Sequence, residues 1–292
     1  MSLSLVSEKN ENLMPINPEM IGKKIEIAPF VYDQDDVIFY ALSVGAGVAE
    51  IDFIYEKNLK VLPTFAILPF MSAIREFKQQ IGSHNFHTLQ LGHELKLHRA
   101  LPTAGTFFST VALRNAYDKG DKGAILVIDV DSVDENGRPA FSNRITAIDR
   151  KGGNFGGDPG PSVKLPDLPA ARPPDFRVEQ QTSPEQAALY RLNGDKHPMH
   201  IDPEYSRIHG FDRPILHGLC ACGFVIRAVL QKCCGGDPER FRTFACRFSK
   251  PCFPGDLFQT RGWQTTANEL LMQTETPDGR VVLDNFAVQL AE

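Results

Sequence analysis

The sequence predicts an α+β fold in which an antiparallel sheet with helices on one face is built twice. In each half of the chain, a helical stretch precedes short alternating or β-branched runs that turn residues separate. Three short motifs of the first half recur in the same order in the second, at spacings of about 150 residues. Between the halves lies a stretch rich in glycine and proline. The sequence therefore predicts one repeat at residues 1–150, a linker at 151–175 and a second repeat at 176–292.

Composition limits the classes of partner. The 292 residues, 42% of them hydrophobic, are enough for two packed cores. A net charge of -5 provides no basic field for a phosphate backbone, so nucleic acid is not an expected partner. Residues 1–13 are polar, and no apolar run reaches the roughly 18 residues that a membrane span needs. The end of the chain, Gln289–Glu292, carries no peroxisomal signal. We expect a cytoplasmic protein that does not enter a membrane.

The cysteine pattern favours free thiols. All six cysteines follow residue 219, and none forms a C-x-x-C pair. They are Cys220, Cys222, Cys233, Cys234, Cys246 and Cys252. A secreted disulfide framework rarely has this distribution, and two of the thiols lie in an apolar run. We therefore expect buried thiols, without disulfides or a metal centre.

The first half begins with helical signals and continues with strands. Acidic residues at Asp33–Asp36 precede a helix that ends near Gly45. A second helix is predicted over Leu62–Phe77, where Pro69 kinks or restarts it. The predicted strands are Leu95–His98, Thr106–Ala116, Ala124–Val133 and Ala140–Asp149.

The second half repeats these signals. Ser183–Gln186 has the capping pattern of a helix that runs into Tyr190–Gly194. The run Leu219–Leu230 is hydrophobic nearly all round, so it should form a helix buried against the sheet. Two further echoes support a repeat: Pro254–Phe258 matches Pro102–Phe107, and Pro277–Arg280 matches Asn136–Arg138.

A candidate site for proton transfer lies between these helices. Asp195 and His200 flank a His-Pro pair that favours an irregular loop. A neutral histidine accepts a proton near pH 7, and a carboxylate can orient a water beside it. Gly218 opens the apolar helix, where an amide without a neighbouring side chain can bind a developing negative charge.

The same residues also have a structural interpretation. An aspartate after a glycine is a common turn residue, and a histidine near a proline can simply bond a carbonyl group. On pattern alone, His197, His209 and His217 are expected to be structural. Asp202 before Pro203 is expected to cap a helix.

Two segments resemble a known family. Tyr190–Asp202 and Pro214–Cys220 resemble the signature blocks of the type 2, (R)-specific enoyl-CoA hydratases of the MaoC-like group. The whole chain is similar to the two-repeat hydratase unit of peroxisomal multifunctional enzyme type 2. Further matching segments are Phe53–Glu56, Leu62–Phe65, Leu101–Pro102, Asp118–Gly120, Arg247–Pro251 and Pro254–Gly255.

The resemblance implies a double hot-dog fold, in which each sheet wraps a long helix and only the second repeat keeps the catalytic loop. It implies that Asp195 and His200 activate the water that adds to a trans-2-enoyl-CoA, giving a (3R)-3-hydroxyacyl-CoA. The Gly218 amide would hold the thioester oxygen. Coenzyme A would enter as part of the substrate, with no other cofactor and no metal. Relatives of this kind also imply a homodimer, and the degenerate first repeat would accommodate acyl-CoA.

The resemblance also implies a set of substrate- and CoA-binding residues, and it gives Glu56 a supporting role. That set is Gly92, His93, Lys119, Asn193, Gly194, Lys196, His197, Pro198, Met199 and Phe248. The chain departs from the family pattern at His197, where the family has asparagine, and at Asn193, where it has a small residue. The family's His-Gly-Glu-Gln block is altered here at Leu91–Glu94.

Two other functions use the same residues. In a hot-dog thioesterase, the acid or base would direct attack on the thioester carbonyl, releasing a free thiol. In a non-catalytic acyl-CoA binder, replacing Asp195 would leave binding intact.

Overall fold

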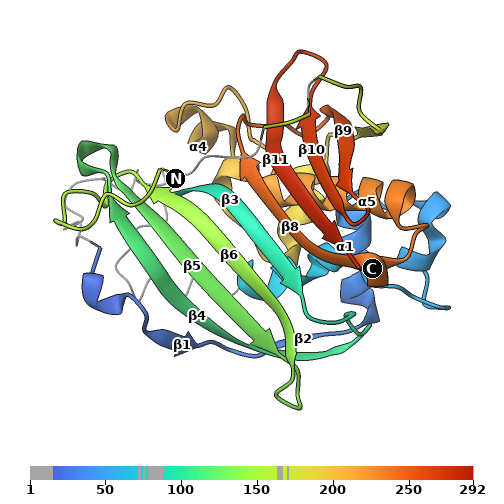
Figure 1. Ribbon diagram of the computed structural model, residues 1–292, viewed down its shortest axis with the longest axis horizontal. Helices are drawn as coiled ribbons and strands as arrows, with labels where there is room; N and C mark the ends of the chain where they lie inside the picture. Colours follow the sequence, from blue (N-terminus) through green and yellow to red (C-terminus); the bar gives the residue numbers. More distant parts are fainter. Residues whose placement is uncertain are drawn as a thin grey trace, which may run out of the picture.

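The structure is a computed structural model that describes residues 16–71, 74, 77, 88–162, 167–169 and 171–291. It contains an 11-stranded sheet in the order β1-β4-β5-β6-β3-β8-β11-β10-β9-β7, and β2 pairs with β4 off this path (Figure 1). The strands are β1 (Lys24–Glu26), β2 (Phe30–Tyr32), β3 (Thr88–Leu97), β4 (Gly105–Asp118), β5 (Ala124–Val133), β6 (Pro139–Asp149), β7 (Phe176–Gln181), β8 (Phe241–Phe248), β9 (Leu257–Thr266), β10 (Glu269–Glu275) and β11 (Val281–Leu290). The α-helices are α1 (Gln34–Ser43), α3 (Gln186–Tyr190), α4 (Pro203–Ile208) and α5 (Gly218–Cys233). The short 3-10 helices are η1 (Pro18–Met20), η2 (Val48–Phe53), η3 (Pro63–Ile67), η4 (Gly120–Lys122), η5 (Arg191–Asn193), η6 (Pro198–His200) and η7 (Pro238–Arg240).

The sheet consists of two similar halves with helices on one face. Strands β4, β5, β6 and β3 form one half, and β8, β11, β10, β9 and β7 form the other. In Figure 1, α1 and α5 lie behind the sheet. Helix α5 packs against β7, β11 and η3, and it buries every residue from Leu219 to Leu230. The predicted double hot-dog fold and the buried central helix are confirmed.

The two halves join where β3 pairs with β8. The register runs antiparallel from Gly92 opposite Arg247 to Lys96 opposite Thr243. Strand β3 begins at Thr88, seven residues before the predicted strand at Leu95. The added segment mixes polar residues with Leu89 and Leu91. It pairs with β6 from Thr88 and with β8 from Gly92. The predicted strands at 106–116, 124–133 and 140–149 correspond to β4, β5 and β6.

The predicted cap of the first helix is confirmed. Asp33 accepts hydrogen bonds from the N–H groups of Asp35 and Asp36, and the Asp36 carboxylate accepts from the Asp33 N–H. This reciprocal pair satisfies N–H groups that the first helical turn leaves without acceptors. The helix ends at Ser43, and Gly45 follows with φ +84°, a conformation that glycine adopts without strain.

Pro69 interrupts its helix as predicted, but the first turn is tighter than an α-helix. Residues Pro63–Ile67 form η3, and the Leu68 N–H donates to the Phe65 carbonyl, three residues back. An α-helix would need that carbonyl to accept from residue 69, which is proline and has no N–H. The chain is helical again at residues 68–71, 74 and 77; residues 72, 73, 75 and 76 of this predicted helix lie outside the described set.

The two hairpins that the sequence matched have the same turn. In the β5–β6 turn, Asp134 donates its N–H to the Arg138 carbonyl, and the Gly137 N–H donates back to Asp134. In the β10–β11 turn, Thr276 pairs with Arg280 in the same way, and a glycine again donates back. The repeat predicted from short motifs therefore extends to individual hydrogen bonds.

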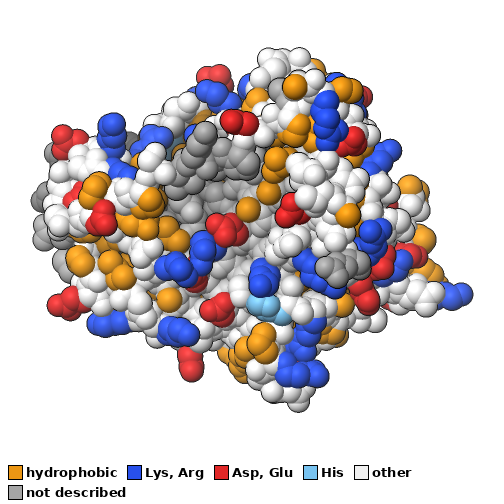
Figure 2. Space-filling model, in the orientation of Figure 1, with side chains coloured by type: hydrophobic (Ala, Val, Ile, Leu, Met, Phe, Trp, Pro, Cys, Tyr) orange, Lys and Arg blue, Asp and Glu red, His pale blue; other side chains and the backbone are white. Residues whose placement is uncertain are grey.

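The six cysteines are free thiols in the second repeat, and all of them except the half-buried Cys233 are buried. On the face seen in Figure 2, basic and acidic side chains are interspersed, which weakens any net field over that face. Among the described residues, none of the helices has both the length and the apolar character that a membrane crossing requires. The predicted polar start at 1–13 and residues 163–166 and 170 of the linker lie outside the described residues.

Candidate active site

The loop that carries the predicted acid and imidazole runs between two short helices. After α3 and η5, Gly194 turns the chain at φ +126°, a conformation that favours glycine. η6 follows, and Asp202 then caps α4 by accepting from the N–H groups of Glu204 and Tyr205 at 2.9 and 3.1 Å. The predicted capping role of Asp202 is thus confirmed. The caps and the glycine turn fix the path of the loop between them.

Asp195 and His200 face each other across a gap. Nε2 of His200 lies 3.9 Å from Oδ2 of Asp195. Nδ1 of His200 lies 2.9 Å from the Ile215 carbonyl oxygen, and because a carbonyl only accepts, Nδ1 carries the proton. In the neutral ring, Nε2 is then the unprotonated nitrogen, directed toward the carboxylate. The gap is too long for a hydrogen bond and suits a bridging water.

A second imidazole, that of His217, packs against this pair. The rings of His200 and His217 stack with centroids 3.6 Å apart and planes inclined by 26°. Nε2 of His217 donates to the Asp195 carbonyl oxygen at 3.1 Å, and it lies 4.0 Å from Oδ2 of the same residue. The His217 side chain is only 2% exposed. A residue that the sequence assigned to structure therefore bonds to the backbone of Asp195 and stacks on the ring of His200.

Burial sets the charges of the site. Burial lowers the pKa of His200, although the Asp195 carboxylate opposes this. Burial also lowers the pKa of His217, to about 3, so this ring is neutral near pH 7. For Asp195, burial raises the pKa, but His217, His200 and the His197 N–H outweigh it and hold the pKa below its usual range. The site near neutral pH thus holds a carboxylate and two uncharged imidazoles.

Gly218 lies at the start of α5, one residue before the predicted start. The first N–H groups of a helix have no acceptor within the helix and form the positive end of its dipole. A Cβ on Gly218 would lie 2.6 and 2.7 Å from ring atoms of Phe248, so the phenyl ring covers this position closely. Phe248 thus lies against the candidate oxyanion position, and the substrate-binding role predicted for it stays a prediction.

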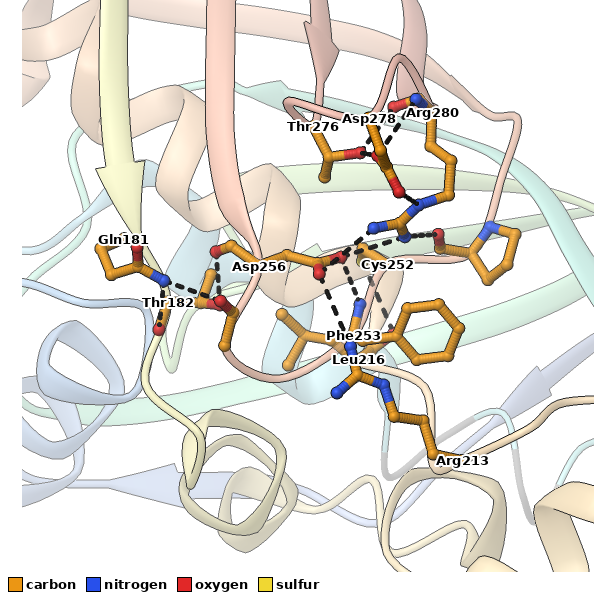
Figure 3. A network of polar contacts seen from close by, with 12 residues as sticks. Gln181, Thr182, Arg213, Leu216, Cys252, Phe253, Asp256, Thr276, Asp278 and Arg280 are labelled. Atoms are coloured by element: carbon orange, nitrogen blue, oxygen red, sulfur yellow. Dashed lines mark hydrogen bonds and ion pairs between the residues drawn. The ribbon is translucent and has the colours of Figure 1, made fainter.

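A polar network fixes the segment that leads into Gly218. The Leu216 N–H donates to the Cys252 carbonyl oxygen at 2.7 Å. Close to Cys252, the largely buried carboxylate of Asp256 accepts from Arg280 at 3.1 and 3.2 Å, and Arg213 approaches it at 3.8 Å (Figure 3). This network ties the loop after β8 to the residues just before α5.

Asn193 anchors the catalytic loop to the first repeat. Its Nδ2 donates to Ser43 Oγ at 2.8 Å and to the Tyr190 carbonyl at 2.9 Å. Ser43 is the last residue of α1, and its own carbonyl accepts from the side chain of Gln186 at 2.5 Å. The residue that departs from the family pattern thus makes a contact between the repeats.

The remaining predicted loop residues have different surroundings. Lys196 is exposed, and Pro198 opens η6. The Met199 carbonyl accepts a hydrogen bond from the Ile215 N–H at 3.2 Å. The Met199 N–H donates to Nδ1 of His197 at 3.3 Å. These bonds hold the loop beside the segment that precedes α5.

Gly92 and His93 lie where the two halves of the sheet join. His93 is 1% exposed, and its ring nitrogens contact Asn143 Oδ1 at 2.8 Å and Gln90 Nε2 at 3.1 Å. Burial lowers its pKa to about 4. A Cβ on Gly92 would lie 2.9 Å from the Cys246 carbonyl oxygen in β8. Both ring nitrogens of His93 are thus engaged inside the core, and the CoA-binding role predicted for Gly92 and His93 stays a prediction.

Lys119 and Glu56 lie apart from the contacts described above. The Lys119 ammonium donates to the carbonyl of Pro159 in the linker. A cavity of about 310 Å³ beside this loop is lined partly by Tyr117 and Phe155. Glu56 is exposed on the segment between η2 and η3. The roles predicted for Lys119 and Glu56 stay predictions.

Sequence reasoning missed a buried ion pair between the repeats. Arg227 of α5 pairs with Glu50 of η2, and the two side chains are only 8% and 9% exposed. Arg227 also donates to the Val44 carbonyl at 3.0 Å. A signal was available, because Arg227 is the only charged residue in the apolar run 219–230. A charge inside such a helix needs a buried partner.

Asp195, His200 and His217 are also close enough to be tested as a metal site, since one ligand atom from each lies within 4.8 Å of the others. The stacked rings oppose this. A metal lies in the plane of each imidazole that binds it, at about 2.1 Å from the nitrogen. Two planes inclined by 26° with centroids 3.6 Å apart meet well beyond that reach. The donor set as arranged therefore suits proton transfer better than coordination of one ion by both rings.

Models of known protein families match both halves of the chain. A MaoC like domain matches residues 167–284, and an MFE-2 hydratase 2 N-terminal domain matches residues 30–151. A probable enoyl-CoA hydratase 2 of Dictyostelium discoideum is 37% identical over 276 residues, which are 91% of this chain and 94% of that protein.

Two solved structures extend the similarity. A MaoC-like dehydratase from Phytophthora capsici is 31% identical with a TM-score of 0.81, and 95% of this chain covers 99% of that one. The full-length peroxisomal multifunctional enzyme type 2 of Drosophila melanogaster is 35% identical with a TM-score of 0.79, and 92% of this chain covers 48% of it. The resemblance seen at Tyr190–Asp202 and Pro214–Cys220 is confirmed, and the chain belongs to the MaoC-like family, within its two-repeat group of hydratase 2 enzymes.

Proposed function

We propose that this chain catalyses the reversible hydration of trans-2-enoyl-CoA to (3R)-3-hydroxyacyl-CoA, with Asp195 and His200 activating the water. The observation that carries this proposal is the 3.9 Å gap between the Asp195 carboxylate and the unprotonated Nε2 of His200. The enoyl-CoA hydratase 2 relative supports the substrate class.

The gap fits one water molecule. Two hydrogen bonds of about 2.8 Å from a water to atoms 3.9 Å apart subtend about 90° at the water oxygen, near the angle between its two hydrogens. Such a water would donate to both groups and direct a lone pair at the substrate. As its oxygen bonds to C3 of the enoyl group, one acceptor takes the proton that the water loses.

The thioester end needs a second contact. Addition at C3 moves electrons toward the thioester oxygen, and C2 of the enolate then takes the proton that the acceptor received from the water. The Gly218 N–H, at the positive end of α5, would stabilise that oxygen. Phe248 beside it would exclude water from the amide. Hydration then adds one hydroxyl at C3 and one hydrogen at C2, and dehydration reverses both steps.

The test measures loss of enoyl-thioester absorbance with a series of trans-2-enoyl-CoAs, followed by chiral analysis of the product. We expect the (3R) product from the wild type and a loss of kcat by roughly 10²- to 10⁴-fold in Asp195→Asn and in His200→Gln. Asp202→Asn is the matched control, because asparagine also caps a helix and activity should stay. A (3S) product or full activity in Asp195→Asn would refute the proposal. Release of free thiol without hydration would instead indicate a thioesterase.

A further inference from the structure

His217 touches three parts of the site. It is the residue immediately before Gly218, at the cap position of α5. Its Nε2–H donates to the Asp195 carbonyl at 3.1 Å, and its ring stacks on His200 at 3.6 Å. One imidazole thus contacts the acid, the base and the start of the helix that carries the amide.

The protonation state of His217 follows from these contacts. Nε2 carries the proton, because its partner is a carbonyl oxygen. Nδ1 is buried and has no hydrogen-bond partner among the residues that the structure describes. An unpaired buried acceptor destabilises the fold, and an apolar side chain of similar size would avoid this cost. The imidazole therefore costs stability at this position, and a cost of that kind is typical of a functional group.

We propose that His217 is a positioning residue that sets the geometry between the water-activating pair and the Gly218 amide, holding Asp195 by its N–H and His200 by its ring face. This inference rests on the proposed hydratase function. Asp195 and Gly218 are 23 residues apart in the sequence, and the His217 contacts connect their two segments directly.

The stacking has a second consequence during the reaction. When His200 accepts a proton, its positive charge faces the π surface of a neutral ring. A cation over an aromatic face is favourable, whereas a second cation there would oppose proton uptake. His217 therefore supports the protonated base without taking the proton itself.

Two substitutions separate the two contacts. His217→Gln keeps an N–H donor and loses the stacked ring, while His217→Phe keeps a ring and loses the donor. Each should lower kcat by roughly 10- to 100-fold, since a misplacement of about 1 Å costs that much. KM for the enoyl thioester should change by less than about threefold, because the contacts of His217 are to the catalytic groups.

His209→Gln is the matched control. Its ring stacks on Tyr205 at 4.2 Å, and its Nδ1 contacts the Tyr205 carbonyl at 2.8 Å, so it makes the same two kinds of contact outside the proposed site. This variant should keep the kcat of the wild type.

The pH profile tests positioning against a merely structural role. His217→Gln would let water reach His200, whose pKa is lowered chiefly by burial. The acid limb of kcat/KM should then move to higher pH, because the base must be unprotonated and hydration of the protonated ring outweighs the lost contact with the His217 face. Asp195, Arg191 and His197 also face His200, and they are unchanged in the variant. The direction of the shift therefore reports the loss of the stacked ring.

Several results would overturn the inference while the wild type still hydrates its substrate. One is that both variants keep kcat within about threefold of the wild type. Another is that kcat falls only in proportion to the folded fraction, with an unchanged pH profile. Nitrogen NMR of the wild type gives a check that needs no variant: His217 must stay neutral with its proton on Nε2 near pH 7. An inactive wild type would refute the proposed function instead.

Discussion

Acid should destabilise the fold through two buried histidines, His93 and His217. They are 1% and 2% exposed, and burial lowers their pKa values to about 4 and about 3. In the unfolded chain both should return to a pKa of about 6.5. Between the folded and unfolded values, the unfolded state binds more protons. The free energy of unfolding should therefore be fully present above about pH 6.5 and fall as the pH drops below it.

The expected loss of unfolding free energy in acid is large. At about pH 5 nearly all of an unfolded-state histidine is protonated, while either buried ring is almost entirely neutral. Proton linkage then gives about 2 kcal/mol for each histidine, or about 4 kcal/mol together, relative to about pH 8. The total free energy of unfolding of a domain is typically about 5–15 kcal/mol.

Urea unfolding at a series of pH values measures this loss, and the single tryptophan, Trp263, is 4% exposed and reports on the fold. His93→Gln should remove about half of the dependence on pH, since glutamine can keep a hydrogen bond but does not titrate. A free energy of unfolding that changes by less than about 1 kcal/mol over this range would refute the assignment of two neutral buried rings.

Three further predictions concern single positions. Gly218→Ala should lower kcat by roughly 10²-fold, because its Cβ would press on the Phe248 ring and displace the amide; full activity in a steady-state assay would contradict this. Asn193→Ala should cost about 1–2 kcal/mol of stability by removing the bond to Ser43, measured by urea unfolding, and an unchanged midpoint would count against the anchoring role. Arg227→Met should cost about 3–5 kcal/mol by leaving a buried carboxylate unpaired, and a loss as small as that of an exposed pair would be inconsistent with the burial.

The features that the sequence predicted well depend on neighbours a few residues away. The Asp33 cap bonds to residues two and three positions on. The turn at Asp134 closes within four residues. Local hydrogen bonds of this kind leave a local pattern, so capping residues and turn glycines identify them.

The features that it missed join distant segments. Asn193 and Ser43 are 150 residues apart, and Arg227 and Glu50 are 177 apart. The start of β3 at Thr88 is a strand because it pairs with β6, and from Gly92 it also pairs with β8. A single sequence contains no periodic signal for such contacts, which tertiary packing decides.

The candidate site divides in the same way. The spacing of Asp195 and His200 identified the pair, but their separation and the proton position depend on the Ile215 carbonyl, 15 residues away from His200. His217 looked structural because nothing in its immediate sequence indicates that its ring stacks on His200. The sequence thus predicted which residue types form the site, whereas the orientation of their side chains is known only from the structure.

The antiparallel seam between β3 and β8 makes this chain resemble an intramolecular dimer. Noncovalent contacts hold the repeats together. They are the hydrogen bonds across that seam, the ion pair of Arg227 with Glu50 and the bond from Asn193 to Ser43. The covalent connection between the repeats raises the effective concentration of one repeat near the other. If a protease cut that connection, we expect the contacts between the repeats to hold at high protein concentration and to be lost on dilution.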